Sequence, residues 1–428
     1  MTNPQVAELI RVANDAQRAG RPVEAERALK RALEVQPDNP VALNSLGMRL
    51  LETGGAEAAV AYFERATAAD PGAAALWMNL AKAQRLLGDA EGEGRSLDAA
   101  LKTDQRHLMA LIRRAELHER LGEHGPGMAR WAGVVALTSQ LDTVPPALEE
   151  VIAHARRYVA DKTAAFESAI QAPVDAARKG LDPADLRRFD ACLGHVLGKR
   201  AIYRNECAGM HFPFLPADEY FDKRLFPWLA ELEAHTPAIA AEAAALLDKG
   251  APGFAPYVSQ DPGTPHNKWT ALDNKMDWGA YFFWKYGERK EEAARLFPAT
   301  AAALKAVPLA VLPGRAPNAF FSVLKPRTRI PAHTGVTNTR AIIHLPLIVP
   351  EGCGFRVGGE TREWRVGEAF AFDDTIEHEA WNDSDEPRAI LILDVWNPHI
   401  TEEERRLIAA YYAAADASGF SPEARDDL

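Results

Sequence analysis

The chain has 428 residues, 47% of them hydrophobic, which is enough for more than one compact core. Its formal net charge of -11 argues against nucleic acid as a general partner, because phosphate binding needs a basic surface. Cys192, Cys207 and Cys353 lie far apart with no CxxC pair, which argues against a disulfide framework or a thiolate zinc site and indicates a reducing compartment.

The N-terminal residues are polar, and no apolar run approaches the roughly 18 residues that a membrane-spanning helix needs. We therefore expect a cytoplasmic protein without stable membrane insertion.

Residues 1–140 carry an internal repeat. Gly20, Gly54, Gly88 and Gly122 are each 34 residues apart, and columns of small residues keep the same step. This period, with a turn glycine between two helices, is typical of tetratricopeptide repeats. We expect about four repeats stacked into an all-α solenoid with a concave surface.

That concave surface has two interpretations at this stage. One is a binding surface for a protein or peptide; the other is a spacer or dimerisation arm, because a repeat pattern reports only the scaffold. Helical sequence then continues from 145 to about 180 and restarts at Pro183, so residues 141–200 are predicted to be a helical cap or linker.

Residues 201–400 have a different texture, aromatic and proline-rich at first. We expect helices over 229–247 and 290–306 and a buried strand near 278–284. From 319 onward short apolar runs separated by Gly, Asn and Asp predict strands. The candidate strands are 320–324, 341–349, 354–357, 361–366, 369–372 and 389–395.

Many short antiparallel strands after a helical part favour a double-sheet jelly roll of the cupin-like kind. The fold class is therefore multidomain α plus β, with a repeat solenoid followed by a jelly roll. Residues 401–428 form a tail whose first part, 401–415, is predicted to be a helix capped by Thr401 with Glu404 three residues on.

Two histidines in the strand-rich part are candidate metal ligands. His333 and His378 could share an ion, since two histidines and a carboxylate with open positions make the facial triad of non-heme iron(II) oxygenases. The carboxylate commonly stands two residues after the first histidine, where this chain has Gly335. The alternative is a pair of hydrogen-bonded structural histidines.

Further polar residues complete a candidate site. Arg388 opens a predicted strand and could grip a dicarboxylate with both arms of its guanidinium group. Ser322 and His344 lie on neighbouring predicted strands, and Arg340 adds a second cation. An iron oxygenase that uses 2-oxoglutarate needs metal ligands, a carboxylate clamp and room for O2.

The acidic residues before His378 have a simpler interpretation than metal binding. Asp373, Asp374 and Glu377 cluster as in a turn held by local side-chain hydrogen bonds. We therefore expect these three residues to stabilise a turn and not to serve as the missing third metal ligand.

The region 212–398 resembles the aspartyl/asparaginyl beta-hydroxylase family, most densely from Ser322 onward. The stretches that carry the resemblance are HTGVTNTR (333–340), HL (344–345), EGC (351–353), ETREW (360–364), FDD (372–374), EHEAW (377–381) and DVWNP (394–398). Order and spacing are both kept.

The resemblance implies a fold and a chemistry. Members of the family are 2-oxoglutarate-dependent iron(II) dioxygenases on a double-stranded beta-helix, and they lack the carboxylate ligand, so Gly335 matches the pattern. The vertebrate hydroxylase also carries tetratricopeptide repeats ahead of its oxygenase domain. By this resemblance the chain would use Fe(II), O2 and 2-oxoglutarate to hydroxylate an aspartyl, asparaginyl or related peptidyl substrate that the repeats recruit.

The resemblance also assigns roles to residues. His333 and His378 would hold the iron, Arg388 with Ser322 would clamp the distal carboxylate of 2-oxoglutarate, and His344 would assist at the carboxylate beside the ketone. Arg340 would pair with an acidic group of the substrate. Trp278 or Trp284 would line the cosubstrate pocket, and of the two we choose Trp284.

One departure from the family pattern and two alternatives remain. The vertebrate enzyme is expected to have a second arginine two residues after Arg340, where this chain has Ile342. The alternatives are an inactive adaptor that only binds a ligand or peptide, which the retained histidines and Arg388 disfavour, and a lipid acyl-chain hydroxylase, which the lack of a basic amphipathic stretch disfavours.

Overall fold

The computed structural model describes residues 3–419, and these divide into two compact units. One unit ends at Gly180 and the other begins at Leu181. Each has its own buried clusters of apolar side chains. None of the helices within 3–419 is long and apolar enough to cross a membrane.

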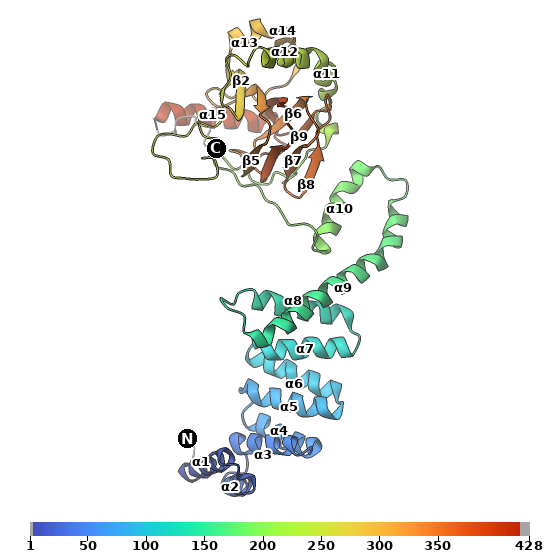
Figure 1. The fold of residues 1–428 in the computed structure, drawn as a ribbon, viewed down its shortest axis with the longest axis vertical. Coiled ribbons are helices and arrows are strands. Elements are labelled where there is room, and N and C mark those ends of the chain that lie inside the picture. The colour runs from blue at the N-terminus through green and yellow to red at the C-terminus, as the bar shows by residue number, and fades with distance from the viewer. Residues whose placement is uncertain (1–2, 420–428) are drawn as a thin grey trace. The chain divides into compact units, whose positions relative to one another are not determined.

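The first unit consists of antiparallel helix pairs, visible as the blue to teal ribbons of Figure 1. The helices are α1 (Pro4–Arg18), α2 (Pro22–Val35), α3 (Pro40–Glu52), α4 (Ala56–Ala69), α5 (Ala74–Leu87), α6 (Ala90–Thr103), α7 (Leu108–Arg120) and α8 (His124–Thr138). Gly20, Gly54, Gly88 and Gly122 all have φ between +68° and +82° in the turns within the pairs. Glycine adopts this left-handed conformation without steric cost, which explains the 34-residue recurrence and confirms the predicted repeats.

Small residues let the helices of a pair approach closely. A Cβ atom on Gly47 of α3 would lie 2.6 Å from Cε1 of Phe63, a fully buried ring of α4. A longer helix, α9 (Pro146–Arg178), follows the pairs and packs Ala155 and Tyr158 against Trp131 of α8.

The second unit begins with helical segments and ends in a helix. These are α10 (Pro183–Val196), the 3-10 helix η1 (Lys223–Leu225), α11 (Leu229–Ala234), α12 (Thr236–Asp248), α13 (Glu291–Leu296), α14 (Pro298–Ala306) and α15 (Glu402–Ser418). The helices expected over 229–247 and 290–306 are each broken once, and the segment after each break carries a proline in its first turn. Thr401 and Glu404 form the expected capping box of α15.

Two antiparallel sheets face each other in the second unit, which confirms the jelly-roll prediction. The larger sheet has the order β1 (Ala255–Pro256), β2 (Trp278–Lys285), β4 (Ala319–Leu324), β11 (Arg388–Trp396), β6 (Arg340–Ile348), β9 (Phe370–Phe372), with β3 (Glu288–Arg289) beside β2. The smaller sheet has the order β5 (Thr328–His333), β10 (His378–Asn382), β7 (Cys353–Val357), β8 (Glu360–Glu363).

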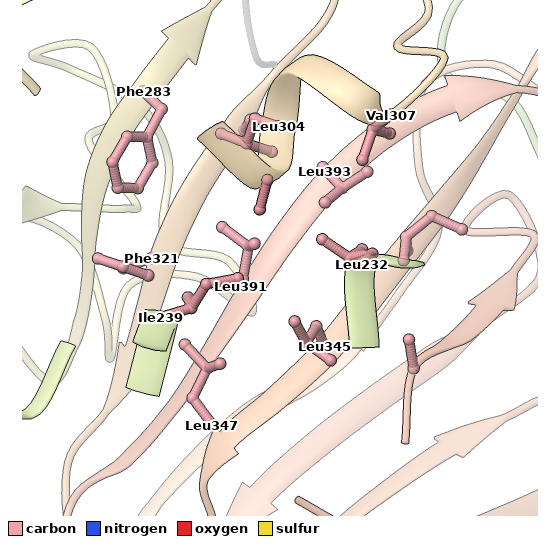
Figure 2. Packing of buried hydrophobic residues seen from close by; sticks show 14 of the residues in the cluster. Leu232, Ile239, Phe283, Leu304, Val307, Phe321, Leu345, Leu347, Leu391 and Leu393 are labelled. Atoms are coloured by element: carbon pink, nitrogen blue, oxygen red, sulfur yellow. The ribbon is translucent and has the colours of Figure 1, made fainter. Parts of the chain in front are cut away.

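The two faces of the larger sheet have different partners. Along β11, Leu391 and Leu393 belong to the face that packs on the helices, where Leu232, Ile239 and Leu304 from α11, α12 and α14 cover them (Figure 2). Burying such a side chain contributes about 1.5–3 kcal/mol, so this layer fixes the sheet firmly. Because side chains alternate along a strand, the even-numbered residues of β11 point to the other face.

Candidate active site

A cavity of about 110 Å³ is lined by side chains from both sheets. Its lining combines apolar residues with a small set of polar ones: Asn318, Ser322, His333, Arg340, His344, Asp374, His378, Arg388 and Asp394. The structure therefore brings together the predicted histidines, both predicted arginines and Ser322. An apolar pocket with few convergent polar groups is the usual form of a small-molecule site.

His333 and His378 are direct partners across β5 and β10. Their ring centroids lie 4.0 Å apart, and each residue is 7% exposed. Nδ1 of His333 lies 2.7 Å from the carbonyl oxygen of Pro331. Nδ1 of His378 lies 3.0 Å from the carbonyl oxygen of Ile376. A carbonyl oxygen only accepts, so each Nδ1 carries the proton and each Nε2 keeps its lone pair.

These two rings fit a divalent transition metal. Metal-binding histidines commonly donate their other ring nitrogen to a backbone carbonyl, as both do here. Burial lowers the pKa of His333 well below its ordinary value and that of His378 to about 4, which keeps both imidazoles neutral, the form that binds metal. Within residues 3–419, no group of three or more His, Cys, Asp or Glu is placed so that it could hold a metal ion.

Gly335 cannot be replaced by a carboxylate ligand without rearrangement. A Cβ atom at this position would lie 2.1 Å from Oδ2 of Asp374, and the Gly335 amide donates to the Asp374 backbone carbonyl at 2.7 Å. Oδ1 of Asp374 is buried without a hydrogen-bond partner among the described residues, and burial raises the pKa of this carboxyl to about 8. The space of the usual third ligand therefore already holds an acidic side chain from the turn between β9 and β10.

Arg388 is a buried cation that has no carboxylate partner among residues 3–419. It is 2% exposed, makes no ion pair within the described part of the chain, and lies with its guanidinium carbon 5.1 Å from the centre of the Trp364 ring. Burial lowers its pKa to about 10. A buried charge without compensation is costly, so this position calls for an anionic ligand.

Ser322 and His344 flank Arg388 on the neighbouring strands. Ser322 pairs with Ile390 across β4 and β11, and its hydroxyl accepts a 3.0 Å hydrogen bond from Nε1 of Trp278. His344 of β6 is buried, with no partner for Nδ1 among residues 3–419, and burial together with Arg388 lowers its pKa well below the ordinary value. Both residues offer polar atoms to an occupant of the cavity.

Trp278 lines the cavity and Trp284 does not, contrary to the choice made from the sequence. Both residues have even numbers on β2, so simple alternation would put them on one face. A register shift between Phe282 and Trp284 reverses the alternation, and Trp284 packs with the apolar cluster on the helix side of the sheet.

Arg340 lies at the cavity but already has a partner. Its Nη1 donates to Oδ2 of Asp394 at 2.6 Å, and the two side chains are only 15% and 5% exposed. The backbone amide of Asn318 donates to the same oxygen at 3.0 Å. The Arg340 charge, predicted to meet an acidic substrate, is thus compensated within the protein.

The sequence reasoning missed several lining residues. Tyr257, from the connection between β1 and β2, stacks on Trp278 with centroids 4.0 Å apart and lines the cavity. Asp394 and Asn318 also line it. Asp394 could have been found, since it lies on the same face of a predicted strand as Arg388, but no local pattern marks Tyr257 or Asn318.

The acidic cluster before His378 divides into different roles. Asp373 accepts hydrogen bonds from the amide and hydroxyl of Thr375, as expected for a turn. Glu377 pairs with Arg356 at 2.9 Å. Only Asp374 of the three lines the cavity.

The comparisons with known proteins agree with this geometry. Residues 233–398 match the family model "Aspartyl/Asparaginyl beta-hydroxylase". The chain is 36% identical over 180 residues to the aspartyl/asparaginyl beta-hydroxylase of Homo sapiens, covering 42% of this chain and 22% of that protein. It is 34% identical over 183 residues to the ornithine lipid ester-linked acyl 2-hydroxylase of Rhizobium tropici, covering 42% of this chain and 60% of that protein.

Among solved structures, the chain is similar to a tetratricopeptide repeat protein from Parabacteroides merdae, with 20% identity and a TM-score of 0.32, over 46% of this chain and 75% of that one. The chain spans less than two thirds of the length of the human and Rhizobium tropici relatives. Residues 233–398 of this chain therefore resemble the aspartyl/asparaginyl beta-hydroxylase family, and they follow a helical region of tetratricopeptide-repeat type.

Proposed function

We propose that this protein is an iron(II)- and 2-oxoglutarate-dependent hydroxylase. The observation that carries the proposal is Arg388, a buried cation that no carboxylate of the described residues pairs with, in a cavity that also holds the His333–His378 pair. The overall reaction converts 2-oxoglutarate and O2 to succinate and CO2 and places the second oxygen atom in a C–H bond of the substrate.

His333 and His378 would hold the iron through Nε2. Their Nδ1 hydrogen bonds fix the tautomer and the ring orientation before the metal arrives. When bound, the iron would supply the redox chemistry that couples O2 reduction to the oxidative decarboxylation of 2-oxoglutarate. With two protein donors, further coordination positions remain for cosubstrate and O2.

The residues around Arg388 would bind 2-oxoglutarate. The Arg388 guanidinium and the Ser322 hydroxyl would bind the carboxylate far from the ketone, and Trp278 orients Ser322 through its Nε1–H. His344 would bind the carboxylate beside the ketone, which gives a role to its Nδ1, an atom without a partner in the described part of the chain. Apolar side chains such as Ile390 and Ile392 exclude water between these groups.

The substrate we propose is an aspartyl, asparaginyl or related peptidyl residue. A human relative that bears this activity in its name supports the choice. Residues 1–140 would recruit the protein or peptide substrate through the repeat surface, residues 141–200 would connect, and residues 201–400 would carry out the chemistry.

A lipid acyl chain is a second candidate substrate. The Rhizobium tropici relative acts on an acyl group by its name, and 60% of its length is covered by this chain. Ile342 faces the cavity where a second arginine was expected, which makes this wall apolar. An inactive adaptor that only binds a ligand or peptide is the third candidate, and the presence of the His333–His378 pair beside Arg388 in one cavity disfavours it.

Succinate formation tests the proposal. Anaerobically iron-loaded protein is mixed with 2-oxoglutarate, and O2 is admitted with or without peptide libraries or lipid vesicles. We expect succinate from the wild type, less than a hundredth of that rate from His378→Ala and Arg388→Met, and near-normal rates from Trp284→Phe, which changes a tryptophan outside the cavity. Equal rates in all four proteins would reject the site.

A further inference from the structure

The cavity near Arg340 contains a charge arrangement that no predicted role explains. Arg340 and Asp394 are joined at 2.6 Å, and both side chains are largely buried. Within residues 3–419, the side-chain hydrogen bonds that Asp394 accepts from Asn318 and Arg340 all end on Oδ2, so Oδ1 remains an available acceptor. The protein thus presents a donor group and an acceptor group side by side.

Among residues 3–419, no second cation lines this end of the cavity. Ile342 stands across from Asp394 in the β6–β11 register and is 9% exposed. Of the residues that line the cavity in the described part of the chain, the other guanidinium is Arg388, six positions earlier on β11. The Asp394 carboxylate offsets the charge of Arg340, so this end does not carry a net positive charge.

We propose that the Arg340–Asp394 pair selects a substrate residue with a neutral carboxamide side chain, asparaginyl, over one with a free carboxylate, aspartyl. The carboxamide oxygen accepts a hydrogen bond from Arg340, and its NH2 group donates to Asp394. This inference rests on the proposed hydroxylase function and specifies its substrate class.

A carboxylate fits this arrangement poorly. It could bind Arg340 only beside Asp394, and two carboxylates at one guanidinium repel each other in a buried site. It also offers no hydrogen atom to Asp394.

A hydrocarbon chain fits poorly for another reason. It would cover the ion pair and strip it of water without supplying a hydrogen bond in return, which penalises binding. The carboxamide satisfies both partners at once, and specificity of this kind arises because the wrong substrate leaves buried polar groups unpaired.

The test compares two degenerate peptide libraries that differ only in a central Asn or Asp. The full-length, iron-loaded protein is incubated with 2-oxoglutarate and an equal mixture of the libraries, and mass spectrometry counts hydroxylated central residues. The wild type is expected to give at least tenfold more hydroxylated Asn than Asp. The product ratio within one protein sample does not depend on how much of that sample is active.

Two variants move the ratio in a defined direction. Asp394→Asn removes the internal counter-charge, and Ile342→Arg adds a cation; each should shift the ratio at least tenfold toward Asp. Ile342→Leu, a matched control that keeps the wall apolar, should leave the ratio unchanged. If Asp394→Asn does not fold, the ratio of hydroxylated Asn to hydroxylated Asp in Ile342→Arg still tests the inference.

Three results would overturn the inference: equal or greater hydroxylation of Asp by the wild type, a ratio unmoved by Ile342→Arg, or succinate formation with lipid vesicles but no hydroxylated peptide. The absence of succinate under every condition would instead reject the proposed hydroxylase itself, so the two failures are distinguishable.

Discussion

The side chain of Asp374 occupies the position that a side chain on residue 335 would need, and residue 335 is a glycine. A side chain on Gly335 would begin 2.1 Å from Oδ2 of Asp374, although the two residues lie 39 positions apart. The loop after β5 therefore needs glycine at this point because the turn before β10 places a carboxyl against it. The missing third ligand is a consequence of packing and not only of residue choice.

This contact predicts a coupled pair of mutations. Gly335→Ala should lower the free energy of unfolding by about 1–3 kcal/mol, because the methyl group meets the Asp374 carboxyl. Gly335→Ala combined with Asp374→Ala should cost less than the sum of the two single changes, since the obstructing atoms are gone. Chemical unfolding of the four proteins measures the coupling, and strict additivity would contradict the shared space.

A second prediction concerns Arg388 without ligand. Arg388→Met should leave the ligand-free protein as stable as the wild type or more stable by about 1 kcal/mol, because it removes a buried charge that no carboxylate within 3–419 compensates. Thermal unfolding without 2-oxoglutarate checks this. A strong loss of stability would mean that Arg388 has a structural partner instead.

The same variant should lose the stabilising effect of the cosubstrate. Anaerobic 2-oxoglutarate at a hundred times its dissociation constant should stabilise the wild type by about 2.7 kcal/mol. Arg388→Met should show no shift at that concentration. An equal shift in both proteins would place the carboxylate elsewhere.

The two tryptophans of β2 provide a matched pair. Trp278→Phe removes the hydrogen bond to Ser322, worth about 1 kcal/mol, and should raise the KM for 2-oxoglutarate roughly fivefold. Trp284→Phe changes a residue on the helix side and should leave the KM unchanged. The reverse pattern would restore the assignment that we made from the sequence.

A last prediction concerns the helical repeats. Gly47→Ala should destabilise α3 and α4, because the methyl group would meet the buried Phe63 ring, and faster hydrogen exchange of their amides would report it. Gly133→Ala in α8 is the control: its Cβ would meet nothing within 4 Å, and the change should stabilise the helix by about 0.5–1 kcal/mol. Equal effects on exchange would contradict the close approach at Gly47.

Much of the fold could be predicted because it rests on periodic signals. The turn glycines recur with the repeat, and apolar runs mark the strands of the larger sheet that are buried on both faces, such as β6 and β11. The strands β5 and β10 escaped prediction because each carries polar residues and lacks an apolar run. The two histidines lie on these strands, so their adjacency could not be seen from strand patterns alone.

The details of the site depend on register, which the sequence does not display. Whether Trp278 or Trp284 reaches the cavity was decided by a bulge in β2, and the partner of Arg340 was decided by how β6 lies beside β11. Tyr257 comes from a connection whose path is set by its stacking on Trp278. These features arise from tertiary contacts and leave no local trace.

The most direct test of the central claim is the source of the oxygen in succinate. Iron-loaded protein is supplied with 2-oxoglutarate under 18O2, and mass spectrometry reads the mass of the succinate formed. If His333 and His378 hold the iron of a dioxygenase, the wild type should give succinate that carries one 18O atom. Neither His333→Ala nor His378→Ala should give any succinate. Unlabelled succinate, or labelled succinate that persists in both variants, would contradict the account.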